Sequence, residues 1–265
     1  MDLGLGERAC ILTGASSGIG RASALLLAGE GMSLLLIGRR EEPLIEVAEA
    51  CRQAGGRAHP MALDVTDPDA GERAVETCLE AFGRLDALVN NAGTSAARDL
   101  EELSDEEWQA QWEIHVMAPL RLMRAAVPVM AERGWGRIVN ISSSSGKRPG
   151  QRNVAYSVTK AAALSLSRAF ADRYASSGVL VNSITPGPVS SELWMATGGL
   201  ADQVARASGS SREEVFAKTS AGVPLGRFGT VQEIAAVVAF LCSEQASFVT
   251  GAAWSVDGGI VPVII

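Results

Sequence analysis

Short apolar runs alternate along the chain with longer segments in which apolar residues recur at helical spacing. Most of the runs are apolar at successive positions, which is typical of parallel strands covered by helices on both faces. The pattern therefore predicts an α/β fold with a mostly parallel sheet of seven strands. The runs span residues 9–12, 33–37, 58–63, 87–89, 137–141, 179–184 and 252–256.

Polar signals at fixed spacing predict where helices begin. A Ser or Thr followed three residues later by Glu forms a capping box, and a proline behind an Asp is a further start signal. Such signals stand at Ser104 with Glu107, at Thr230 with Glu233 and at Asp67-Pro68.

The stretch 188–222 departs from the alternation of strands and helices. Within it, Ser210 and Glu213 have capping-box spacing, which predicts one or two short helices inside a long excursion. The chain shows no internal repeat and no linker. We therefore expect a single domain over residues 1–265 that carries an excursion at 188–222.

Composition excludes several classes of partner. The net charge is −7, from 23 basic and 30 acidic residues, and no long basic run offers a site for nucleic acid. The longest apolar run, 234–242, is much shorter than the roughly 20 residues of a membrane span, and residues 1–7 do not resemble a secretory signal. The cysteines lack metal-type spacing, which favours a reducing cytoplasm and no metal site; they are Cys10, Cys51, Cys78 and Cys242.

A glycine-rich turn follows the first predicted strand and precedes a helical stretch at 21–28. Glycine allows a tight turn and a close approach to a pyrophosphate, and the helix N-terminus behind it offers free N–H groups to that anion. The placement after a strand favours a dinucleotide site of Rossmann type over a merely glycine-rich loop. The residues that we expect to bind the cofactor here are Gly14, Ser16, Ser17, Gly18, Ile19 and Gly20.

The end of the second predicted strand indicates which dinucleotide binds. An acidic residue there would hydrogen-bond the ribose 2′-hydroxyl of NAD, but the sequence has Arg39 and Arg40 instead. Arginine pairs with a 2′-phosphate through forked, charge-assisted hydrogen bonds. NADP is therefore expected in preference to NAD, unless both arginines simply face solvent.

Tyr156 and Lys160 lie four residues apart in a segment of helical character, so that both side chains project from one face. An ammonium close to a phenol favours the phenolate and lowers the phenol pKa from its usual value near 10. This pair therefore predicts general acid/base chemistry at Tyr156, although the same spacing also occurs on ordinary helix surfaces.

Four motifs in order give the chain a resemblance to the short-chain dehydrogenase/reductase family over essentially its whole length, and to its 3-oxoacyl-acyl-carrier-protein reductase members in particular. They are the glycine turn, Asn90-Asn91-Ala92-Gly93, Asn140-Ile141-Ser142-Ser143 ahead of Tyr156, and Pro186-Gly187. The resemblance implies a doubly wound Rossmann-type sheet and a homotetramer, built partly from helices around 103–130 and 155–174.

The resemblance also implies the roles of individual residues. Ser143 would hydrogen-bond the substrate oxygen, Tyr156 would exchange the proton, and Lys160 would hold the nicotinamide ribose. The residues implied to contact the rest of the cofactor are Asp64, Val65, Asn91, Ala92, Gly93, Pro186, Gly187, Val189 and Ser191.

One position departs from the family pattern. His115 stands where members generally have an asparagine that supports the lysine through a water. An imidazole both donates and accepts protons, so His115 is a candidate catalytic relay. The alternative is a buried helix histidine with weakened catalysis around it. His59, at a predicted strand edge, is expected to have no chemical role.

Substrate identity is expected to depend on the excursion, because ligands of open α/β sheets bind beyond the strand ends. Leu193, Trp194 and Met195 are candidate substrate contacts or, alternatively, packing residues of a folded lid. Separately, the basic residues Lys147, Arg148 and Arg152 would attract an anionic substrate or simply face solvent.

Three functions fit the sequence. The first is NADP-dependent reduction of a small-molecule ketone, with a 3-oxoacyl thioester as one candidate; the second is oxidation of a sugar, steroid or other secondary alcohol by the same residues. The third, a dinucleotide-binding redox sensor with little turnover, is motivated by His115. The apolar tail 261–265 is expected either to bury itself at a subunit contact or to fold back on its own subunit.

Overall fold

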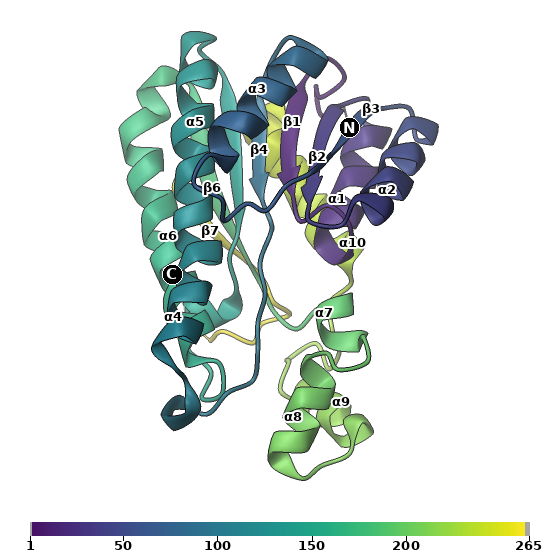
Figure 1. Ribbon diagram of the computed structural model, residues 1–265, viewed down its shortest axis with the longest axis vertical. Coiled ribbons are helices and arrows are strands. Elements are labelled where there is room, and N and C mark those ends of the chain that lie inside the picture. The colour runs from purple at the N-terminus through teal and green to yellow at the C-terminus, as the bar shows by residue number, and fades with distance from the viewer. Residues whose placement is uncertain (1, 263–265) are drawn as a thin grey trace.

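Within residues 2–262, which the computed structural model describes, seven parallel strands form one sheet in the order β3-β2-β1-β4-β5-β6-β7. Observed and predicted strands differ by at most two residues at either end. The predicted α/β fold, a doubly wound Rossmann-type sheet in a single domain, is confirmed (Figure 1). The strands are β1 (Ala9–Thr13), β2 (Ser33–Gly38), β3 (Arg57–Ala62), β4 (Ala87–Asn90), β5 (Gly136–Ile141), β6 (Val179–Pro186) and β7 (Ala253–Val256).

Two layers of helices cover the sheet, and each layer encloses its own part of the core. One layer consists of α1 (Gly18–Gly29), α2 (Glu41–Gln53) and α10 (Val231–Cys242). The opposite layer consists of α3 (Ala70–Phe82), α5 (Ala118–Glu132) and α6 (Val154–Tyr174), and α4 (Asp105–Trp112) runs into α5 through the π-helical turn Glu113–Met117. Short 3-10 helices lie at Leu100–Glu102, Ser144–Gly146, Ala175–Ser177 and Glu244–Ala246.

The continuous helical run Asp105–Glu132 is, among the described residues, the one that is long and apolar enough by length and composition to cross a membrane. Its apolar side chains contribute to the hydrophobic core, because Leu122, Met123, Ala126 and Met130 are buried on the face of the sheet that α3, α5 and α6 cover. Packing therefore accounts for its composition. Charged residues such as Arg121 and Arg124 interrupt this run, so it contains no long uninterrupted apolar stretch.

The excursion at 188–222 folds into three short helices, rather than the one or two predicted: α7 (Glu192–Met195), α8 (Leu200–Ser208) and α9 (Arg212–Ala221). They lie beyond the carboxyl ends of the strands, away from the two covering layers (Figure 1). Edge-to-face contacts of Trp194 and Phe216 with Phe228 hold α7 and α9 to the segment that follows them.

Two of the three predicted capping boxes are confirmed, and the third lies one residue away from its predicted position. Ser104 and Thr230 form complete capping boxes, as predicted. The box in the excursion uses Ser211 with Glu214, one residue beyond the predicted pair Ser210 and Glu213, which has the same spacing.

The prediction at Asp67-Pro68 was wrong. There the backbone N–H of Ala70 closes a turn onto the Asp67 carbonyl, so α3 begins at Ala70 behind Asp69. Asp67 and Pro68, which had been expected to begin the helix, lie in this turn instead.

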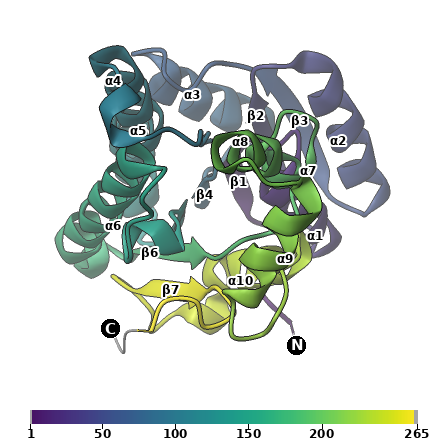
Figure 2. The same ribbon diagram turned by 90° about the horizontal axis from the view of Figure 1, so that it is seen from below.

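The strand order places a topological switch point between β1 and β4. From β1 the chain adds β2 and β3 on one side, and from β4 it adds β5, β6 and β7 on the other side. Leu12 pairs with Val89 across these strands, so both end at the same level of the sheet. Seen from below, α7, α8 and α9 lie on one side of this edge and α4 and α6 on the other (Figure 2). Loops from both halves of the sheet therefore meet where a ligand would bind.

Candidate active site

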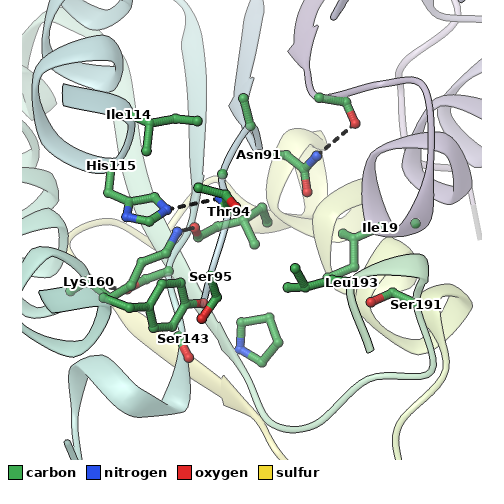
Figure 3. A pocket seen from close by; sticks show the side chains of 18 of the residues that line it. Ile19, Asn91, Thr94, Ser95, Ile114, His115, Ser143, Lys160, Ser191 and Leu193 are labelled. Carbon is green, nitrogen blue, oxygen red and sulfur yellow. Dashed lines mark hydrogen bonds between the residues drawn. The ribbon is translucent and has the colours of Figure 1, made fainter. Parts of the chain in front are cut away.

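A cavity of about 1300 Å³ follows the carboxyl ends of the strands. It is lined from the β1–α1 turn, from the ends of β2, β4, β5 and β6, and from α6 and α7. Figure 3 shows Ser95, Ser143, His115 and Lys160 on one side of it and Ile19, Ser191 and Leu193 on the other. Every residue predicted to contact the cofactor lines this cavity except Gly20.

Glycines shape the β1–α1 turn in two different ways. Gly14 and Gly18 have φ values of 66° and 53°, a backbone conformation that side chains disfavour. Gly20 instead packs against the turn: a Cβ there would collide with the Gly14 carbonyl oxygen and lie 2.6 Å from Nδ2 of Asn91. Gly20 therefore supports the cofactor turn from behind.

Thr13 and Asn91 tie the glycine turn to the end of β4. Nδ2 of Asn91 donates to the carbonyls of Thr13 and Gly14 at 3.0 and 3.1 Å, while the Thr13 hydroxyl accepts the N–H groups of Asn91 and Ala92 at 3.0 Å each. Thr13 was not among the predicted site residues. Its signal was available, since Thr13 is a buried hydroxyl that ends an apolar strand just before the turn.

Arg39 and Arg40 lie exposed at the end of β2, on the cavity wall. Among the described residues neither guanidinium makes a hydrogen bond or an ion pair. Asp64 lies nearby, and the backbone N–H of Thr66, reinforced by its hydroxyl and by the charge of Arg39, holds the pKa of Asp64 below its usual value. This end of the cavity thus presents two free cations.

Ser143, Tyr156 and Lys160 come together where β5 ends and α6 begins. The Ser143 hydroxyl accepts the N–H of Ser145 at 3.1 Å, and Nζ of Lys160 donates to the Ile141 carbonyl at 2.8 Å. The neighbouring Ser142 is turned away and donates to the Lys160 carbonyl at 2.9 Å, so its hydroxyl stabilises the fold. Of these two serines, Ser143 is the one free to face a substrate.

The predicted lowering of the Tyr156 pKa is wrong for this structure. Burial raises the pKa of Tyr156 above 10, and its interaction with the Ser143 hydroxyl opposes that shift only in part. The ammonium of Lys160 does not reverse it, because Nζ is bound to a carbonyl and lies 5.5 Å from the centroid of the Tyr156 ring. Burial also lowers the pKa of Lys160 to about 8.

His115 lies in the π-helical turn with 2% of its surface exposed. Its Nε2 accepts the backbone N–H of Thr94 at 3.3 Å, and its Nδ1 lies 3.0 Å from the hydroxyl of Thr159. The imidazole meets the Tyr156 ring edge-on, with ring centroids 5.3 Å apart. Burial, and next to it the charge of Lys160, lower the pKa of His115 to about 2. The imidazole is therefore neutral.

The predicted substrate residues divide into two groups. Leu193 and Trp194 line the cavity, whereas Met195 does not, and its carbonyl accepts from Arg212 within the excursion. Lys147, Arg148 and Arg152 do not line the cavity. Lys147 donates to the Ala253 carbonyl at 2.7 Å, and Arg152 pairs with Asp99 at 3.5 Å.

Ser95 is a cavity residue that sequence reasoning missed. It is 7% exposed, it lines the same side of the cavity as Ser143 and Lys160 in the view of Figure 3, and its hydroxyl makes no hydrogen bond among the described residues. A hydroxyl that lines a cavity without a hydrogen-bond partner is suited to a polar ligand. Its position just after the β4 motif was the only signal in the sequence.

The cavity fits a nicotinamide dinucleotide. The left-handed glycines leave space for a pyrophosphate at the N-terminus of α1, the free arginines lie at one end, and the Ser143, Tyr156 and Lys160 group lies at the other. Among the described residues, no group of three or more His, Cys, Asp or Glu side chains is arranged to hold a metal ion.

Comparisons with known proteins agree with this geometry. A family described as enoyl-(acyl carrier protein) reductase matches residues 14–261. The 3-oxoacyl-acyl-carrier-protein reductase FabG of Thermotoga maritima is 34% identical, over 96% of this chain and 98% of that protein.

Two solved structures show the same fold along the whole chain. L-sorbose reductase of Gluconobacter frateurii, complexed with NADPH and L-sorbose, superposes with a TM-score of 0.92 at 35% identity and full coverage of both chains. NAD⁺-bound xylitol dehydrogenase superposes with a TM-score of 0.90 at 29% identity, over 98% of this chain and 100% of that one.

Proposed function

The chain belongs to the short-chain dehydrogenase/reductase family of oxidoreductases that act on CH–OH groups, and from this premise we propose that it reduces the ketone of a small molecule to a secondary alcohol with NADPH. The observation that carries the proposal is the shared cavity, with the glycine turn and two free arginines toward one end and Ser143, Tyr156 and Lys160 at the other.

Each residue at the catalytic end has its own role in carbonyl reduction. NADPH, when bound, supplies the hydride. Ser143 and Tyr156 hold the carbonyl oxygen, and Tyr156 donates its phenolic proton to that oxygen as negative charge develops there. The raised pKa keeps the phenol protonated at neutral pH, which suits a proton donor. Lys160 would hold the nicotinamide ribose and place a positive charge beside the phenol.

The NADP preference rests on Arg39 and Arg40. Both guanidiniums line the cavity, and neither is committed to a carboxylate among the described residues. A 2′-phosphate would satisfy them, whereas the 2′-hydroxyl of NAD would not. Relatives of similar fold bind NADPH in one case and NAD⁺ in another, so the preference comes from these side chains.

The catalytic end of the cavity favours a neutral, polar substrate over an anionic one. Besides Ser143 and Tyr156, its polar groups include Ser95, Ser145 and Asn153, its apolar wall includes Trp194, and Lys160 is the cation beside Tyr156. The L-sorbose reductase complex is a precedent for a neutral, hydroxylated ketone. The similarity to FabG supports a 3-oxoacyl thioester as the second candidate substrate.

The remaining proposals concern direction, location and assembly. Oxidation of a sugar, steroid or other secondary alcohol with NAD(P)⁺ is the alternative reaction, because the same residues serve both directions. The four free, buried thiols support a cytoplasmic location. We further propose a homotetramer, with no nucleic-acid or membrane partner.

The test is cofactor turnover over a panel of ketones and alcohols, measured with NADPH and with NADH. The panel pairs hydroxylated ketones with plain ketones and a 3-oxoacyl thioester. We expect NADPH-dependent reduction, and an NADPH affinity that falls to that of NADH when Arg39 and Arg40 are both changed to Ala. A parent enzyme with equal affinity for both cofactors would overturn the NADP assignment, and turnover of no substrate would favour the redox sensor.

A further inference from the structure

The hydrogen bonds around His115 define which nitrogen carries its proton. Nε2 accepts the N–H of Thr94, so its lone pair must be free of a proton. On the other side of the ring, the Thr159 hydroxyl has one hydrogen and donates it to the Tyr156 carbonyl at 2.9 Å. Nδ1 must then be the donor to Thr159. Two independent bonds lead to the same neutral tautomer, with the proton on Nδ1.

The hydrogen bonds around His115 cannot pass a proton onward. The bonds run from Nδ1–H of His115 to the hydroxyl of Thr159 and end on the carbonyl oxygen of Tyr156, which has no proton to pass on. A second proton on Nε2 would point at the Thr94 N–H, so two donors would face each other.

The surrounding charges also disfavour a second proton on the imidazole. The ionisable groups that face the ring, among the described residues, are Lys160 and Tyr156 of α6. Glu113 of the same π-helical turn is paired with Arg121 of α5 at 3.0 Å. The nearest charge is thus the ammonium of Lys160, which repels an imidazolium.

The same contacts connect three parts of the catalytic end. Through Thr94 the ring holds the segment that follows β4, and through Thr159 and its T-shaped contact with the Tyr156 ring it holds the first turns of α6. Gly93 lies against it so closely that a Cβ there would be 3.1 Å from Nε2. The imidazole fills the space between these segments.

We propose that His115 is a positioning residue, a permanently neutral histidine protonated on Nδ1 that fixes the Tyr156 turn of α6 against the Thr94 segment, and that it is not a proton relay. Its catalytic consequence rests on the proposed function, but its protonation state does not. In this chain an imidazole side chain occupies the place of the family's asparagine and holds Tyr156, the proposed proton donor, in position.

Nitrogen-15 NMR of the full-length protein labelled at histidine tests the tautomer directly. The chain has two histidines, and exposed His59 on β3 is an internal control that a His59→Gln variant assigns. We expect His115 to stay a neutral Nδ1–H ring from about pH 5 to about pH 9. Titration of His115 in that range, or a proton on Nε2, would overturn the proposal.

Kinetics of His115→Ala, His115→Asn and His115→Gln test the positioning role. The Ala variant removes both bonds and the ring, and we expect kcat to fall about 10- to 100-fold through misplacement of Tyr156. Asn and Gln can each restore one bond and should give intermediate kcat values. The pH at which kcat is half-maximal should stay unchanged in all three, since a positioning residue does not titrate. A shifted pH profile in the Ala variant would show a relay instead.

Discussion

The Tyr156 hydroxyl is subject to opposing influences at the scale of a single residue. Burial raises its pKa, and the Ser143 hydroxyl opposes the shift. Sequence spacing predicted that Tyr156 and Lys160 would meet, because residues four apart share a helix face, and the family resemblance implied that Ser143 would join them. Spacing could not predict the protonation state, which depends on how deeply the phenol is buried and on where Nζ of Lys160 points.

This protonation state predicts how rate depends on pH. Reduction needs the protonated phenol, whose population is full below the raised pKa and falls as pH rises through it. Oxidation needs the phenolate, whose population grows over the same range. We therefore expect kcat for reduction to stay within about twofold from pH 6 to pH 9, while kcat for oxidation climbs.

Initial rates in both directions at saturating substrate check this prediction. A reductive kcat that already falls through pH 7, with oxidation at its maximum there, would mean that the phenol ionises near neutrality. That was the expectation from the Tyr156 and Lys160 spacing alone.

At the scale of the element, α1 illustrates what a pattern can and cannot predict. Three glycines between a strand and a helix predicted the phosphate turn, and all of the turn's expected contacts except Gly20 line the cavity. The capping box in the excursion is the opposite case. Ser210 with Glu213 and Ser211 with Glu214 have identical spacing, so only packing of the three-helix excursion decides that α9 starts after Ser211.

The two ends of α1 offer a matched pair of substitutions. Gly20→Ala places a Cβ against the Gly14 carbonyl and the Asn91 amide, so we expect loss of NADPH binding and about 1–3 kcal/mol of destabilisation. Gly29→Ala meets no atom within 4 Å and should be neutral or stabilise the helix by up to about 1 kcal/mol. Urea unfolding and NADPH titration measure both effects. If Gly20→Ala bound NADPH like the parent, the turn would not have the tight packing described.

At the scale of the whole molecule, alternating runs predicted the fold class and the number of strands. The strand order is a matter of long-range pairing, which no local pattern contains; it followed from the family resemblance and is seen in the pairing of β1 with both β2 and β4. Part of the apolar tail at 261–265, namely residues 263–265, lies outside the described residues, so its expected contact stays a prediction.

Exposed apolar side chains bear on the proposed tetramer. Trp112 of α4 and Val158 of α6 are 39% and 43% exposed on the helices expected to pair, and Phe248, just before β7, is fully exposed. Light scattering behind a sizing column should give four times the mass of one chain at micromolar concentration. Changing Trp112 and Val158 to Ser should shift that mass toward smaller species. A monomeric mass for the parent would contradict the tetramer.

The central claim is that Tyr156 donates the proton in an NADPH-dependent reduction, and kcat of Tyr156→Phe tests it most directly. The chain has one other tyrosine, Tyr174 at the end of α6, so Tyr174→Phe is the matched control. On a ketone that the parent reduces, kcat of Tyr156→Phe should fall by roughly 10²- to 10⁴-fold, with NADPH affinity within about twofold of the parent. Tyr174→Phe should keep parental turnover. Near-parental kcat in Tyr156→Phe would contradict the account.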